Sequence, residues 1–148
     1  MNIYSRVSFT LTGALLFALP NTGAALESQF IDQFAATSAI CAEDNNGAGN
    51  GPTCLRTLLP LLSTVRATTS GAQYDTEIGA MALAIVTTYN QLGNPIPEVC
   101  QTLAGALEET GKSAVDQGQA DQIFAIAQAV SACRGVQSNL DRLLASPN

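Results

Sequence analysis

Four cysteines, Cys41, Cys54, Cys100 and Cys133, each lie at an end of a segment with helical spacing, and they limit how those segments can pack. An even number of cysteines in an exported chain is typical of disulfides, which staple small domains. The sequence contains no histidine and no two cysteines separated by two residues. Zinc, haem and redox motifs therefore lack their usual ligands, and we expect no metal site and no cofactor.

The order of the cysteines along the chain favours one pairing out of three. Cys41 ends one helical segment and Cys54 begins the next, so a tight connection brings them together. Cys100 begins a segment and Cys133 ends the following one, and in an antiparallel hairpin those two ends are neighbours. Such ends meet the Cα separation of about 4.4–6.8 Å that a disulfide requires. We predict Cys41–Cys54 and Cys100–Cys133; the alternative is Cys41–Cys133 with Cys54–Cys100, if all four lie at one end of a bundle.

Apolar residues recur at steps of three and four along most of the chain, which is the pattern of helices that bury one side. This spacing predicts helices over residues 27–41, 54–69, 74–92, 97–111 and 121–133. Sustained alternation of β-branched and polar residues is absent, so we expect no strands. The predicted fold is all-α, an up-and-down bundle of about five helices stapled by two disulfides.

Glycines and prolines mark the boundaries of these segments. Pro60 predicts a kink or a restart within the second helix. Gly93, followed by two prolines, predicts the stop of the third helix, and Gly111 predicts the end of the fourth. Near the C-terminus, Leu140, Leu143 and Leu144 form the apolar stripe of a short sixth helix.

A slide of the sequence by 46 residues aligns Cys54 with Cys100 and Asp75 with Asp121. This match predicts two 46-residue helical-hairpin repeats. An alternative is that two well-capped helices of similar length produce the same coincidences. Ser70-x-x-Gln73 and Asp116-x-x-Gln119 both have the spacing of a capping box, in which side chains satisfy free amides at a helix start. Both interpretations remain open at this point.

Residues 1–25 have the three-part plan of a secretory signal peptide. Arg6 precedes an apolar run of 13 residues, and small residues follow up to a predicted cut after Ala24 or Ala25. The run is shorter than the roughly 20 residues that span a bilayer, so we expect no stable membrane anchor. Residues 26–148 then form a single helical domain, and the protein is periplasmic or secreted.

The chain is acidic but sparsely charged. Its net charge is −6, and charged residues make up 12% of it, about half the usual share. An acidic protein repels the negatively charged phosphates of nucleic acids, so we expect no nucleic-acid partner. A surface covered largely by neutral polar residues and alanine favours a protein partner.

The stretch between the first two cysteines, 41–54, is rich in Asp, Asn and Gly and invites comparison with a calcium loop. Counted from Asp44, Ala48 and Leu55 occupy positions five and twelve, where calcium needs oxygen ligands. We therefore predict a turn closed by a disulfide, with positive φ angles at its Asn and Gly residues. Weak cation binding at Glu43 and Asp44 remains an open alternative.

Nothing in the sequence assembles a catalytic group, so we expect that the protein is not an enzyme. A histidine base is missing, and four bridged cysteines leave no thiol. Glu108 and Glu109 are adjacent on a helix and point about 100° apart. The remaining carboxylates, Asp75 and Glu77 among them, are expected to be solvated charges of caps and loops.

The expected function is an exported interaction protein that presents a rigid helical surface to a protein partner, as an inhibitor, immunity factor, adaptor or assembly subunit. The 43–52 loop, or the helix that carries Tyr74 and Tyr89, could carry the contact, since tyrosine is favoured at interfaces. The alternative for both tyrosines is packing in the core with the hydroxyl in water. The alternative is a carrier of a small apolar ligand. Small side chains in AMALAIV and IFAIAQAV could leave room for such a ligand inside the bundle.

Overall fold

The structure is a computed structural model that describes residues 28–136. This part of the chain contains five α-helices, one short 3-10 helix and no strand. They are α1 (Ile31–Cys41), η1 (Asn45–Gly47), α2 (Gly51–Thr68), α3 (Gly71–Gln91), α4 (Pro97–Ser113) and α5 (Gln117–Ser131). The predicted all-α bundle of five helices is therefore confirmed. The predicted signal peptide at 1–25 and the sixth helix around Leu140 lie outside the described residues.

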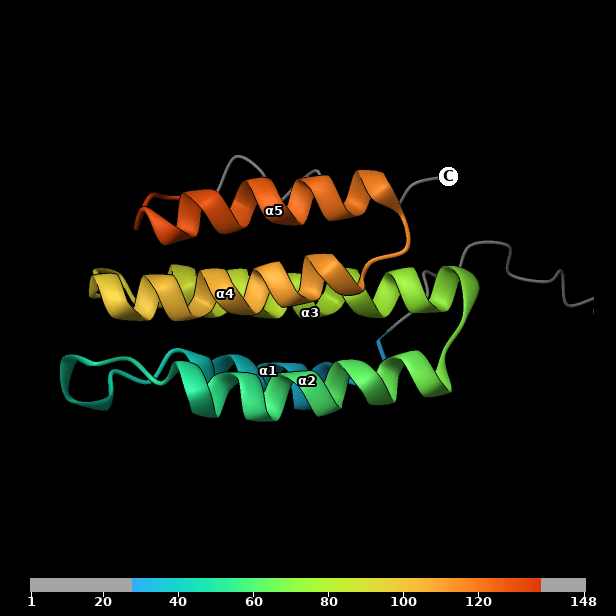
Figure 1. Ribbon diagram of the computed structural model, residues 1–148, viewed down its shortest axis with the longest axis horizontal. Coiled ribbons are helices and arrows are strands. Elements are labelled where there is room, and N and C mark those ends of the chain that lie inside the picture. Colours follow the sequence, from blue (N-terminus) through green and yellow to red (C-terminus); the bar gives the residue numbers. More distant parts are fainter. Residues whose placement is uncertain (1–27, 137–148) are drawn as a thin grey trace, which may run out of the picture.

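Helices α1 to α4 form a four-helix bundle, and α5 packs on its outside. Helix α1 packs against α2 and α3, and α4 packs against the same two helices from the other side. Figure 1 shows α1 and α2 as one layer, α3 and α4 as the next, and α5 above them, with successive helices running in alternating directions. Helix α5 packs chiefly against α4 and only lightly against α3. The topology is the predicted up-and-down arrangement.

The core lies between these layers and is made almost entirely of aliphatic side chains. The largest apolar side chains that are fully buried are Phe34, Leu58, Ile78, Met81, Ile85, Leu103, Leu107, Ile123 and Ile126. On α3 the apolar side chains Ile78, Met81, Ile85 and Tyr89 recur at steps of three and four residues and are all buried. Leu92, three residues further on, is the C-cap of the helix and is 36% exposed.

Helix α2 continues through Pro60 and does not restart there. Pro60 lies on the exposed side of the helix, where its missing amide leaves the Arg56 carbonyl facing water rather than the core. The Pro60 carbonyl accepts a hydrogen bond of 3.0 Å from the Thr64 hydroxyl. The helix also begins earlier than predicted, at Gly51, because Pro52 is well suited to the first helical turn.

The two expected capping boxes form only in part. The Asp116 carboxylate accepts a 2.6 Å hydrogen bond from the Gln119 amide N–H, as predicted. The Gln119 side chain does not return the bond, because its Nε2 donates instead to the Asp75 carbonyl at 2.9 Å. At Ser70, the side chain makes no cap hydrogen bond. The two helix starts thus differ in detail, and the 46-residue repeat stays a prediction.

Candidate functional site

The four cysteines form the two predicted disulfides. Cys41 and Cys54 are bonded with a Cα separation of 4.5 Å, and Cys100 and Cys133 with a separation of 5.5 Å. The alternative pairing is excluded. No cysteine of the chain is free, so no thiol is present for nucleophilic chemistry. The first disulfide ties the end of α1 to the first turn of α2, and the second ties the start of α4 to the residues after α5.

The loop between α1 and α2 is a turn that hydrogen-bonds to itself. Its backbone has positive φ at Asn46, Gly47 and Gly49, as the sequence predicted. The Asp44 carboxylate accepts from the Gly47 N–H at 2.6 Å, and the Glu43 carboxylate accepts from the Asn50 side chain at 2.8 Å. Within residues 28–136, no three metal-type ligands gather in one place. Cation binding by this loop therefore gains no support.

Gly49 fixes this loop against α4. The residue is buried, and a Cβ atom added to it would lie 3.0 Å from the Glu98 carbonyl oxygen and 3.0 Å from the Thr102 hydroxyl. Only glycine combines the positive φ with so close an approach. The loop is consequently held at its disulfide and at Gly49, just before α2 begins.

Glu77 is not the solvated charge that the sequence suggested. Its side chain is fully buried. The Ser28 hydroxyl donates to Oε2 at 2.5 Å, and the Gln29 backbone N–H donates to Oε1 at 3.0 Å. The Gln73 side-chain amide donates to Oε1 at 2.7 Å. A buried carboxylate is stable only when donors surround it, so Glu77 joins the segment before α1 to α3.

Asp75 is also not the fully solvated charge that the sequence suggested. Its Oδ1 atom is buried and has no hydrogen-bond partner, and the same is true of Gln119 Oε1. The exposed carboxylates behave as predicted: Glu108 is exposed, and Glu109 forms an i,i+3 ion pair with Lys112 at 2.7 Å. Such surface pairs contribute little to stability.

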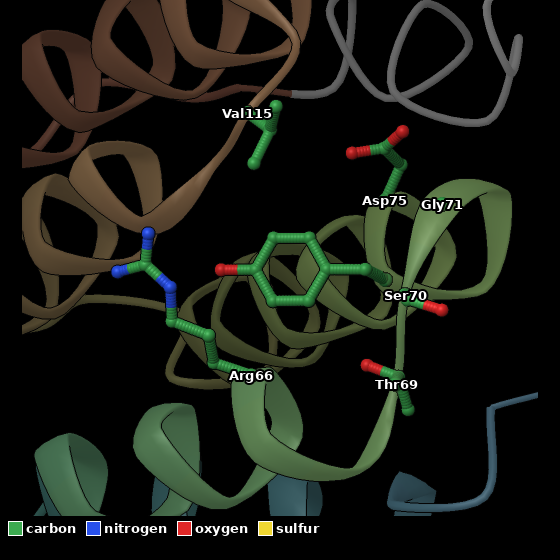
Figure 2. A pocket seen from close by; sticks show the side chains of 7 residues that line it. Arg66, Thr69, Ser70, Gly71, Asp75 and Val115 are labelled. Carbon is green, nitrogen blue, oxygen red and sulfur yellow. The ribbon is translucent and has the colours of Figure 1, made fainter.

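A small pocket opens at the junction of α2, α3 and the α4–α5 connection. Its volume is about 240 Å³, and it is lined by Arg66, Thr69, Ser70, Gly71, Tyr74, Asp75 and Val115. Figure 2 shows Arg66 on one side of the pocket, Asp75 on the other, and Val115 on the connection that closes it from a third side. The Tyr74 hydroxyl is already engaged, since it donates to the Ser113 carbonyl at 2.5 Å. The pocket has no nucleophile with a base beside it, and its volume falls below the roughly 300–1,000 Å³ of typical ligand sites.

Both tyrosines pack in the core, the alternative to a contact role, and their hydroxyls donate to backbone carbonyls instead of to water. Tyr74 and Tyr89 are 5% and 6% exposed, and the Tyr89 hydroxyl donates to the Arg134 carbonyl at 2.9 Å. Burial raises the pKa of both phenols above 10.0; at Tyr74 the nearby Arg66 opposes this rise and Asp75 adds to it. Neither tyrosine ring is therefore exposed to a partner in this structure.

These raised values predict an alkaline transition. The neutral phenol is favoured in the folded state, so its contribution to stability is present below about pH 10 and is lost as the pH rises through the folded pKa. Once the predicted signal peptide, which contains Tyr4, is removed, Tyr74 and Tyr89 are the remaining tyrosines. We expect their tyrosinate absorbance to develop at higher pH in the folded protein than in urea. Identical titration curves in both solvents would contradict this.

The first half of α2 carries the features of a contact surface. Among the described residues, three of the five exposed large apolar side chains belong to α1 and α2: Ile31 (51% exposed), Leu55 (38%) and Leu59 (47%). Arg56 follows Leu55 on α2, is exposed, and has no ion-pair partner within residues 28–136. Helix α2 contains no acidic residue. We call Leu55, Arg56 and Leu59 the α1–α2 face.

The sequence pattern did not single out this face. The segment LRTLLPLL contains two overlapping apolar stripes, and Leu58 and Leu62 of one stripe are buried. Leu55 and Leu59 belong to the other stripe. This segment contains more leucines than one core-facing stripe can hold, and that excess was the feature of the sequence that could have indicated exposed leucines.

A comparison of this chain with protein families, characterised proteins and solved structures finds no match. Within residues 28–136, no helix has both the length and the hydrophobicity needed to cross a membrane. Two disulfides are typical of an oxidising, extracellular-type environment.

Proposed function

We propose that this protein is exported to the periplasm or the extracellular space and acts without catalysis, by binding a protein partner through the α1–α2 face. The observation that carries the proposal is that the exposed Leu55 and Leu59 lie next to Arg56, which has no ion-pair partner within residues 28–136, on a helix that lacks acidic residues. Apolar side chains grouped on one surface favour association, and arginine is enriched at the centres of protein interfaces.

The charge of α2 indicates the chemistry of the partner. The whole chain has a net charge of −6, yet Arg56 and Arg66 give α2 a charge of +2. A partner surface with carboxylates around an apolar centre complements this arrangement. Surfaces of the same protein that carry acidic residues would be repelled from such a partner, which favours a single docking orientation.

Rigidity supports the same function. The Cys41–Cys54 disulfide joins α1 to α2, and Gly49 seats the loop between them on α4. A surface that is already ordered loses less conformational entropy on binding, so more of the contact energy remains as affinity. The inhibitor, immunity, adaptor and assembly roles share this requirement for a rigid surface.

The carrier alternative has weaker support. The small side chains of the alanine-rich helices α3 and α5 leave no space for a ligand, since Ala82, Ala127 and their large neighbours are buried in one core. The 240 Å³ pocket beside Tyr74 has an arginine and a carboxylate at its rim, which suits an apolar ligand poorly. Binding of a small apolar ligand is therefore the second hypothesis for the function. It is tested by analysing the purified protein for bound lipid.

The test is a matched pair of variants used for capture from the exported fraction of the native source. We expect Leu55→Glu/Leu59→Glu to weaken capture of the partner at least tenfold, because both side chains lose apolar contacts and gain repulsion from carboxylates. Leu92→Glu, which changes a similarly exposed leucine away from this face, should capture as the wild type does. Arg56→Glu should weaken capture most at low salt.

Two results would contradict the proposal. A captured protein that is retained equally by the double variant and by Leu92→Glu would place the contact elsewhere. If the purified protein contains lipid in a stoichiometric amount, the function as a ligand carrier is favoured over binding of a protein partner.

A further inference from the structure

The two disulfides differ in how far they are open to solvent. The second one joins the start of α4 to the end of α5, which meet at one end of the bundle (Figure 1). Cys41, Cys54 and Cys100 are fully buried in the core, whereas Cys133 is exposed. Exposed disulfides are the ones that exchange with thiols, because exchange begins when a thiolate reaches one of the two sulfur atoms. Solvent access therefore favours attack at Cys133 and shields the Cys41–Cys54 bridge.

The buried partner, Cys100, is placed to be the leaving group of such an attack. It lies in the first turn of α4, which begins at Pro97. The positive end of a helix stabilises negative charge, so a thiolate released at this position is favoured. Glu98, the acidic residue of the same turn, is exposed, and water and salt screen its charge. A leaving thiolate that is stabilised in this way departs faster.

The backbone of Cys133 is held independently of its sulfur. The Cys133 N–H donates to the Val130 carbonyl at 2.8 Å, and the Arg134 N–H donates to the Ala129 carbonyl at 3.0 Å. These two bonds form the Schellman motif that ends α5, with Cys133 at its position of positive φ. The Arg134 carbonyl in turn accepts from the Tyr89 hydroxyl. The end of α5 therefore stays in place when the sulfur bridge opens.

We propose that the Cys100–Cys133 disulfide is a reversible exchange site for low-molecular-weight thiols, whereas the Cys41–Cys54 disulfide stays closed. The thiolate of the small molecule attacks Sγ of Cys133 and forms a new S–S bond with it. The bond from Cys133 to Cys100 breaks, and its electron pair leaves with Cys100 as a thiolate. In the reverse step the Cys100 thiolate attacks the same sulfur of Cys133 and expels the small thiol, so the cycle needs no added oxidant or reductant.

The charge beside the attacked sulfur favours an anionic thiol. Arg134 follows Cys133, is exposed, and has no ion-pair partner among the described residues. An exposed cation attracts a thiolate that also carries carboxylates, such as that of glutathione, more than one whose ammonium group cancels its charge, such as that of cysteamine. The exchange leaves the bridge between α1 and α2 closed, so the inference does not depend on the partner proposed for the α1–α2 face.

Exchange of the folded protein with glutathione tests the site. The oxidised protein is incubated with reduced glutathione, quenched in acid, alkylated in urea, digested and mapped by mass spectrometry. We expect the earliest product to carry glutathione on Cys133 and the alkyl group on Cys100. It should form about tenfold or more faster than any product of the Cys41–Cys54 bridge. The variant Cys100→Ser/Cys133→Ser, shown to be folded by circular dichroism, should take up no glutathione over the same period.

The variant Arg134→Glu provides a second measurement, since it keeps both sulfurs and the backbone hydrogen bonds of residue 134. It should slow the reaction with glutathione about threefold or more at low salt and change the reaction with cysteamine much less. Each of three results would overturn the proposal: glutathione found first on Cys100, both disulfides opening at the same rate, or Cys100–Cys133 opening only as fast as the whole protein unfolds. Equal slowing of both thiols in Arg134→Glu would remove the preference for anionic thiols.

Discussion

Reduction of both disulfides should lower the melting temperature of this protein by more than about 10 °C. The Cys41–Cys54 bridge closes a loop with a sequence separation of 13 residues, and the Cys100–Cys133 bridge one of 33 residues. On the chain-entropy model, loops of these lengths stabilise by about 3 kcal/mol and slightly more, so roughly 6 kcal/mol together. In a domain of this size, 1 kcal/mol corresponds to several degrees in the melting temperature.

The measurement is a thermal melt with and without dithiothreitol, followed by circular dichroism. The control is the quadruple variant Cys41→Ser/Cys54→Ser/Cys100→Ser/Cys133→Ser, which should melt at the reduced temperature and be insensitive to dithiothreitol. If the oxidised and reduced proteins melt together, the bridges contribute nothing to stability, and the rigidity assumed for the α1–α2 face is lost.

The disulfide pairing and the helices could be predicted because both depend on neighbours in sequence. Cys41 and Cys54 flank one short connection, and the core stripe of α3 follows from its 3.6-residue period. A turn rich in Asn and Gly likewise forecasts positive φ at Asn46 and Gly47. These features need no knowledge of how the helices pack against one another.

The surface and the buried carboxylate could not be predicted, because they depend on packing between distant segments. The leucines of α2 fill two stripes, and only the position of α1 and α4 decides that Leu58 is buried and Leu59 is exposed. Glu77 receives its hydrogen bonds from Ser28 and Gln29, which are 48 or more residues away in sequence. Periodicity places Glu77 at the edge of the core face but gives no sign of its donors.

Removal of the Glu77 carboxylate should be among the most destabilising single substitutions in this chain. Glu77→Ala removes a fully buried side chain and leaves the half-buried Ser28 hydroxyl and the Gln29 backbone N–H without their acceptor. The cavity left by the side chain and the lost hydrogen bonds each cost about 1–2 kcal/mol, since donors this close to water recover part of their bonding. We expect a loss of about 2–4 kcal/mol in the free energy of unfolding, measured with urea.

Two further variants separate hydrogen bonding from charge and from general effects of losing a glutamate. Glu77→Gln keeps the shape and one acceptor oxygen, and the Ser28 hydroxyl can turn to accept from the new amide, so this variant should lose clearly less than Glu77→Ala. Glu98→Ala changes an exposed glutamate and should stay within about 0.5 kcal/mol of the wild type. Since Glu77 connects the residues before α1 to α3, its loss should also speed hydrogen exchange at Gln29 and Phe30 before it affects α5. A Glu77→Ala protein as stable as Glu98→Ala would mean that these donors find water, and that the N-terminal segment is held by its apolar contacts alone.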